Sequence, residues 1–173
     1  MRSLLIRLLF CLASATAAIA QSLPEGMEEI GRFNVVIGEV PESFIAAHIP
    51  AMGKSYVTAR ESAGFRILNV AGGSLEKDSR LISILIGPFT GNLPETASFE
   101  LYDGPSVLAA NVDTGLRVTL SNSTLGEDGT LEFHFEGKAV PAERTSDGVM
   151  VPIDGASPVS VSGTFSGFIP AAE

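Results

Sequence analysis

The sequence predicts an all-β fold, most simply an antiparallel β-sandwich, with a small barrel as the alternative. Short apolar runs that alternate with period two recur along the chain, and turn residues separate them. The 18 glycines and 10 prolines fall mostly singly between these runs and form no long linker. Long helical patterns, which the crossovers of a parallel sheet need, do not interrupt the runs. Many short strands joined by turns are typical of sandwiches and small barrels.

The first segment, MRSLLIRLLFCLASATAAIA at residues 1–20, has the pattern of a secretory signal peptide. Arg2 and Arg7 precede a short apolar run, and a small-residue triplet ends at Ala20. The run is well short of the roughly 20 apolar residues that a spanning helix needs. We therefore expect cleavage near Ala20, no membrane span in the mature chain, and an exported product that is periplasmic or secreted.

The first segments after the signal peptide predict one strand and at most one short helix. In GRFNVVIGEV, residues 31–40, Phe33 and Val35 share one face, as they would on a half-buried strand. Residues 43–48, SFIAAH, are mostly apolar without alternation, and Pro50 follows them. Proline ends a helix, so this segment could form one or two helical turns.

Two further runs predict strands in the middle of the sheet. In GFRILNV, residues 64–70, Leu68 and Val70 lie opposite Asn69. RLISILIG, residues 80–87, is almost continuously apolar, which favours a central strand covered on both sides.

Later runs of about five to seven residues complete the predicted sheet, with turn sequences such as Asp103-Gly104-Pro105 between them. In the last one, hydroxyl residues alternate with apolar residues and glycines. Without a histidine or lysine nearby these hydroxyls are poor nucleophiles, so we interpret them as the outer face of a strand. The remaining predicted strands are residues 98–102, 106–112, 116–120, 130–135, 138–142, 148–153 and 159–165.

Composition restricts how the mature domain, residues 21–173, is stabilised and what it binds. The only cysteine, Cys11, lies in the predicted signal peptide, so disulfides and cysteine–zinc sites are excluded. Burial must stabilise the domain, and a chain of this size can bury roughly 68–70% of its unfolded surface. The formal net charge is −9, and two of the 11 basic residues belong to the signal segment. Such acidity disfavours nucleic acids, and we expect a monomer whose partner is a protein or small ligand of the cell envelope.

One candidate for chemistry is TLEFHFEG, residues 130–137. On a strand, Glu132, His134 and Glu136 share one face, about 7 Å apart in sequence order. Histidine and carboxylates are ligands of divalent metals, and carboxylates also raise the pKa of a neighbouring histidine. Side chains at alternate positions of one strand run parallel, however, so the same row is typical of a solvated strand face. We predict no catalytic residue and no cofactor.

A second candidate is a recognition loop in GPFTGNLPETAS, residues 87–98. Phe89, Asn92 and Leu93 lie between two prolines, which would hold an exposed apolar group rigid. Loops at the ends of β-scaffolds commonly carry recognition. The sequence NST at residues 122–124 would be a glycosylation site only in a eukaryotic host.

Several of these segments occur in an order that resembles a known group of proteins. They are SYVTAR, FRILNVAGG, RLISILIGPF, GTLEF and VSVSGTFSG, which together span about residues 55–168. The chain resembles exported bacterial β-sandwich domains of unknown function that end in a GTFSG-type strand. The resemblance implies the fold and export, and it brings no catalytic residues.

The sequence therefore favours an exported, non-enzymatic domain of the bacterial cell envelope that acts in binding or as a structural component. The alternative is a small metal-assisted hydrolase or lyase centred on His134.

Overall fold

The computed structural model describes residues 23–77 and 79–170, and the predicted signal peptide, residues 1–20, lies outside this part. The described residues form β-strands and one 3-10 turn, η1. Among them, no helix has the length and apolar character to cross a membrane. The elements are β1 (Glu28–Ile37), β2 (Val40–Ile49), η1 (Pro50–Met52), β3 (Lys54–Ser55), β4 (Val57–Ser62), β5 (Phe65–Gly73), β6 (Arg80–Phe89), β7 (Thr96–Asp103), β8 (Ser106–Ala110), β9 (Val118–Leu125), β10 (Thr130–Arg144), β11 (Met150–Pro152) and β12 (Val159–Phe168).

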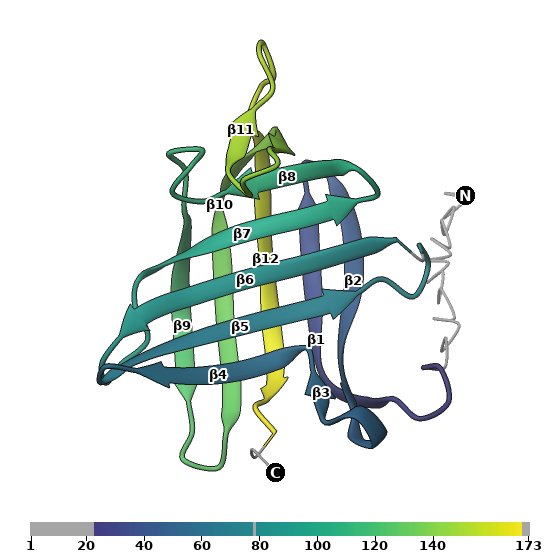
Figure 1. Cartoon of the computed structure of the whole chain (residues 1–173), viewed down its shortest axis with the longest axis vertical. Coiled ribbons are helices and arrows are strands. Elements are labelled where there is room, and N and C mark those ends of the chain that lie inside the picture. The colour runs from purple at the N-terminus through teal and green to yellow at the C-terminus, as the bar shows by residue number, and fades with distance from the viewer. Residues whose placement is uncertain (1–22, 78, 171–173) are drawn as a thin grey trace, which may run out of the picture.

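The strands close into an eight-stranded antiparallel barrel with extra strands attached. Following the hydrogen bonds, the order is β2, β1, β12, β10, β8, β7, β6 and β5, and pairing of Ile45 with Gly73 joins β5 back to β2. β9, one of the extra strands, pairs with the first half of β10 and with the first two residues of β7. In Figure 1, β4 to β8 cross in front of β9, β10, β12, β1 and β2. The all-β prediction is confirmed, and the structure supports the small barrel over the sandwich.

The interior of the barrel is filled by apolar side chains, and several phenylalanines lie among them. The ring of Phe33 lies 4.7 Å from that of Phe165, which stacks on Phe133 at 5.4 Å between centroids. The rings of Phe99 on β7 and Phe135 on β10 are 5.9 Å apart. All five rings are buried, and aromatic pairs at these spacings add to the stabilisation that burial gives. The barrel therefore encloses a packed core.

Two glycines of β12 allow the neighbouring strands to approach it. A Cβ on Gly163 would lie 2.6 Å from the backbone oxygen of Asn34 in β1, and one on Gly167 would lie 2.5 Å from that of Ile30. Phe165, between these glycines, points into the core while Thr164 points to solvent. The hydroxyl row of β12 is thus on the outer face, as predicted, and the glycines mark close backbone contacts.

Three sequence-based predictions about the strands are wrong. Residues 43–48 belong to β2 and not to a helix. The prediction failed because Phe44 and Ile45, on opposite faces of the strand, are both buried, so the sequence lacks the alternation expected of a strand. β6 is covered on one face only, and Leu85 on its other face is 45% exposed. Several strands are also longer than expected, and β10 extends over 15 residues.

The last residues of β10, from Ala142 to Arg144, form a hairpin with β11, which stands above β8 in Figure 1. Val107, Ala109, Ala142 and Met150 form a small buried cluster there, separate from the main core, and Tyr102 packs against it. This cluster lies on the outer side of β7 and β8, since the residues between its members on β8 face the interior. It fixes the hairpin next to the site described below.

Candidate functional site

Outward side chains of β5, β6 and β7 form a polar row on the outside of the barrel. Ser83 of β6 is directly opposite Glu100 of β7, and its hydroxyl donates to the Oδ1 atom of Asn69 on β5 at 3.1 Å. Their neighbours in sequence face the core, for example Phe99 and Leu101 on either side of Glu100. Packing of those neighbours therefore holds the row in place.

Asn111 holds the loop between β8 and β9 against this row. Asn111 is 6% exposed, and it is the only polar residue among the described residues that is buried. The Oδ1 atom accepts the backbone amides of Asp113 and Thr114 at 3.1 Å, and the Nδ2 atom donates to Glu100 Oε1 at 2.9 Å. A single side chain thus shapes the loop and positions the carboxylate.

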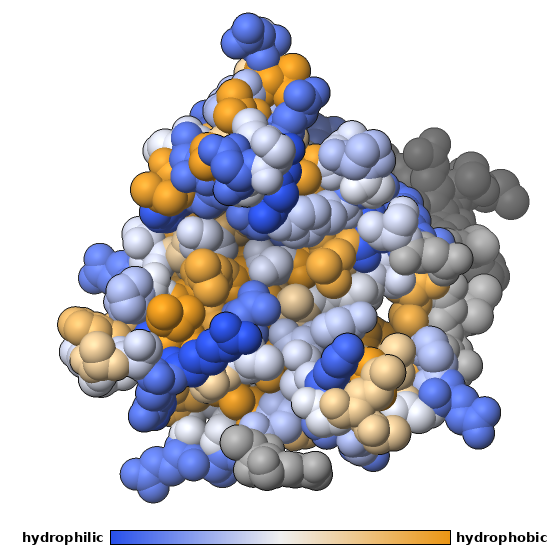
Figure 2. Space-filling model, in the orientation of Figure 1, coloured by the Kyte–Doolittle hydropathy of each residue, from blue (hydrophilic) through white to orange (hydrophobic). Residues whose placement is uncertain are grey.

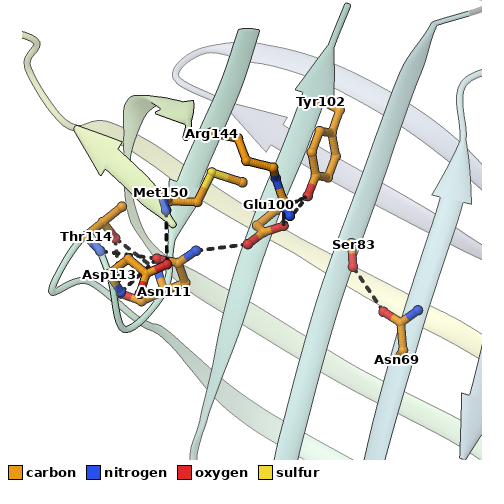
Figure 3. Close-up of polar contacts among 9 residues, drawn as sticks. All are labelled: Asn69, Ser83, Glu100, Tyr102, Asn111, Asp113, Thr114, Arg144 and Met150. Atoms are coloured by element: carbon orange, nitrogen blue, oxygen red, sulfur yellow. Dashed lines mark hydrogen bonds and ion pairs between the residues drawn. The ribbon is translucent and has the colours of Figure 1, made fainter. Parts of the chain in front are cut away.

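The other oxygen of Glu100 accepts two more donors (Figure 3). Tyr102 donates its hydroxyl, and Arg144 of β10 donates from Nη2 at 3.2 Å while lying 5.7 Å from the centre of the Tyr102 ring. Burial, followed by the hydrogen bond to Glu100 and its negative charge, raises the pKa of Tyr102 to about 12. The phenol therefore keeps its proton at neutral pH and acts as a donor.

The hairpin of β10 and β11 also contacts the site. The backbone amide of Met150 donates to Asp113 Oδ2 at 3.0 Å, and Met150 itself is buried in the small outer cluster. Both anchors of the loop, Asn111 and Asp113, thus bind groups on other strands. The loop is held by the barrel on one side and by the hairpin on the other.

A cavity of about 280 Å³ opens between the polar row and this loop. Its wall includes two apolar side chains, Leu85, which is 45% exposed, and Val112, which is 74% exposed. Figure 2 shows this face of the molecule, where apolar side chains lie among polar ones over β5 to β7. The cavity is lined by Asn69, Ser83, Leu85, Ser98, Glu100, Asn111, Val112 and Asp113.

The polar groups of the cavity suit binding better than catalysis. Glu100 accepts three hydrogen bonds, one of them from a guanidinium, so its lone pairs are largely engaged. The hydroxyl of Ser83 donates to an amide oxygen and not to a base, so it is not activated as a nucleophile. An array of this kind can recognise a ligand by hydrogen bonds and charge.

The predicted row Glu132, His134 and Glu136 lies on the outer face of β10, with the core residues between them pointing inward. Ser166 donates to Glu132 Oε1 at 3.1 Å, and His134 is opposite Thr164 in the register. The three side chains do not converge: among the described residues, no group of three or more histidine, cysteine or acidic residues could hold a metal ion.

The predicted recognition loop is divided between the core and a groove. Phe89 is buried in the main core, so the expectation that it is an exposed apolar group is wrong, and Leu93 packs partly against the same core. Asn92 is exposed and, with Leu93, lines an open groove of about 710 Å³ beside Arg66 and the hairpin that joins β9 to β10. A recognition role for Asn92 therefore stays a prediction.

Sequence reasoning missed Glu100, Tyr102, Asn111 and Arg144, which come from two strands, β7 and β10, and from the loop after β8. A local signal existed in SFELYD, residues 98–103, where Glu100 and Tyr102 alternate with core residues. The pairing that unites these residues is not visible in a single strand.

Comparisons of the chain with protein-family models, with curated proteins and with solved structures found no match. The geometry and charge of the site are therefore the evidence for its function.

Proposed function

We propose that the chain is an exported, non-enzymatic binding domain of the cell envelope that recognises a small ligand, or one side chain of a partner, in the cavity beside Glu100. The observation that carries this proposal is the fixed position of Glu100. Three donors from β7, β10 and the loop after β8 hold its carboxylate at the edge of an open cavity. Groups held in place before binding lose little entropy when a ligand arrives.

The packed interior supports a site on the outer surface. Eight-stranded barrels either fill their interior with side chains or enclose a ligand there. Here the rings of Phe33, Phe165 and Phe133 contact one another on three adjacent strands, and the ring of Phe99 on β7 lies 5.9 Å from that of Phe135 on β10. A ligand is therefore expected on the outside, where the polar row, the loop and the hairpin meet.

A nuclear magnetic resonance titration of the ¹⁵N-labelled protein tests this proposal. We expect at least one probe from a panel of amines, sugars and amino acids to shift the amides of Ser83, Glu100 and Asn111 in a saturable way. Ser98→Phe, which places a ring in the cavity, should abolish the shifts. Thr164→Phe, an equivalent change on the outer face of β12, should leave them unchanged. A panel in which no probe shifts these amides contradicts the proposal.

A further inference from the structure

We propose that the cavity binds a primary ammonium group on a short aliphatic chain, as carried by a lysine side chain of a partner or by a free alkylamine. This inference rests on the proposed function and identifies the class of ligand. It follows from the charge, the hydrogen-bonding capacity and the apolar wall of the cavity.

The charge of the cavity is negative. The charge of Glu100 is compensated by Arg144, whose Nη2 atom lies 3.2 Å from Oε2. Asp113 forms no ion pair within the described part of the chain, and its Oδ2 atom accepts only a neutral amide from Met150. One of the two acidic residues that line the cavity therefore carries an uncompensated charge, which favours a cation and disfavours phosphates and carboxylates.

The two carboxylates and the Ser83 hydroxyl next to them can act as hydrogen-bond acceptors for a ligand. Ser83 donates its only hydroxyl proton to Asn69, so its oxygen is left to accept. Asp113 Oδ1 accepts no bond from the described residues, and Glu100 Oε1 accepts one. An ammonium group has three donors and no acceptor, which matches this set. The Nδ2 atom of Asn69 and the hydroxyl of Ser98, which also lines the cavity, can donate, and a sugar whose hydroxyls used them is the competing ligand.

The apolar wall and the size of the cavity fit an aliphatic chain. Leu85 and Val112 are apolar side chains that are exposed to solvent. Methylene groups of a ligand that packed against them would be removed from contact with water, which is favourable. Pockets for drug-sized ligands have volumes of roughly 300–1,000 Å³. The cavity has about 280 Å³, which suits one side chain better than a large ligand. Lysine side chains commonly bury their stem while the charged end stays with polar groups.

The test compares matched probes by the same amide titration. n-Butylamine and n-butanol differ in the ammonium group, and N-acetyl-lysine-methylamide and its norleucine counterpart differ in the same way within a peptide frame. We expect both amines, and neither neutral partner, to shift the amides of Ser83 and Asn111 saturably. Tighter binding of the lysine derivative than of n-butylamine would identify a protein side chain as the source, and the reverse order would identify a free amine.

Two variants separate the charge of the cavity from the charge of the whole protein. Asp113→Asn keeps an acceptor for the Met150 amide and removes the uncompensated charge, so the dissociation constant of the amines should rise about three- to fivefold, the size expected for an exposed charge. Glu136→Gln makes the same change in net charge on β10 and should have no effect.

The outcomes distinguish this inference from the proposed function. Equal shifts with butylamine and butanol, or equal weakening by both variants, overturn the inference. Sugars that shift the cavity amides while amines do not overturn it as well, and they leave the binding function standing. No cavity shift with any probe contradicts both.

Discussion

Replacing Asn111 with alanine should destabilise the protein by about 3 kcal/mol. The substitution removes three side-chain hydrogen bonds, two from the backbone amides of Asp113 and Thr114 and one to the carboxylate of Glu100. A neutral bond contributes roughly 0.5–1.5 kcal/mol and one to a charged group roughly 1.5–3 kcal/mol. The sum is about 2.5–6 kcal/mol. The exposed loop lets water reach the two freed amides, so the value should lie near the lower end.

Urea unfolding followed by circular dichroism measures this loss. For a slope of about 2 kcal/mol/M, a loss of 3 kcal/mol lowers the midpoint by roughly 1.5 M. Asn92→Ala is the control, because that asparagine is exposed and should change stability by at most about 0.5 kcal/mol. In a double-mutant cycle, Asn111→Ala and Glu100→Ala should couple by about 1–2 kcal/mol, since the two side chains are in contact.

Two results would refute this reasoning. A loss below about 1 kcal/mol for Asn111→Ala would mean that water replaces all three bonds at little cost. A coupling energy near zero would mean that Asn111 does not bind Glu100 in solution.

Three further predictions concern packing, charge and protonation. Gly163→Ala should cost about 2–3 kcal/mol in thermal unfolding, because the added Cβ lies 2.6 Å from a backbone oxygen of β1. Gly73→Ala, whose Cβ meets nothing within 4 Å, should cost less than 1 kcal/mol. Glu42→Gln should cost about 2–3 kcal/mol at neutral pH, because its carboxylate lies 3.0 Å from Arg80 and both side chains are largely buried. The phenol of Tyr102 should ionise near pH 12 in an ultraviolet titration, and the stability that it contributes below pH 10 should be lost as the pH rises from 10 to 12, since the folded state holds the proton more tightly.

Each of these predictions has a result that contradicts it. Equal unfolding temperatures for the two glycine variants would show that β1 and β12 are not in close contact. Glu29→Gln, which breaks an exposed ion pair with Arg32, should be nearly silent, and a loss equal to that of Glu42→Gln would mean that burial does not matter. Ionisation of Tyr102 near pH 10 would mean that the phenol is neither buried nor bound to Glu100 as in this structure.

The faces of the strands could be predicted from the sequence, because period-two alternation depends on neighbouring residues only. Leu68 and Val70 face the core and Asn69 faces outward, and the phenylalanines of β10 point inward between Glu132 and Glu136. The strand at residues 43–48 of β2 was not predicted, because both faces of β2 are buried near Ile45. Apolar composition without alternation cannot distinguish a helix from a doubly covered strand.

Closure of the barrel and assembly of the site could not be predicted, because both depend on contacts between distant residues. A single paired position, Ile45 with Gly73, joins β2 to β5, and no local pattern marks it. Arg144 is separated from Glu100 by 44 positions and reaches it because the second half of β10 runs beside β8. The candidate row on β10 was visible in one strand, but ligands for a metal must converge from several directions.

The structure separates the residues that hold the fold from those that would hold a ligand. Phe99 and Leu101 are buried in the main core and fix the backbone on either side of Glu100, whereas Asn111 fixes only its side chain and the adjoining loop. Loss of Asn111 should therefore loosen the carboxylate and the loop while the floor of the cavity keeps its place. Asp113→Asn preserves the bond from Met150, so it should weaken amine binding with little loss of stability. A variant that lost affinity only in proportion to its loss of stability would indicate that the cavity and the fold are not separable in this way.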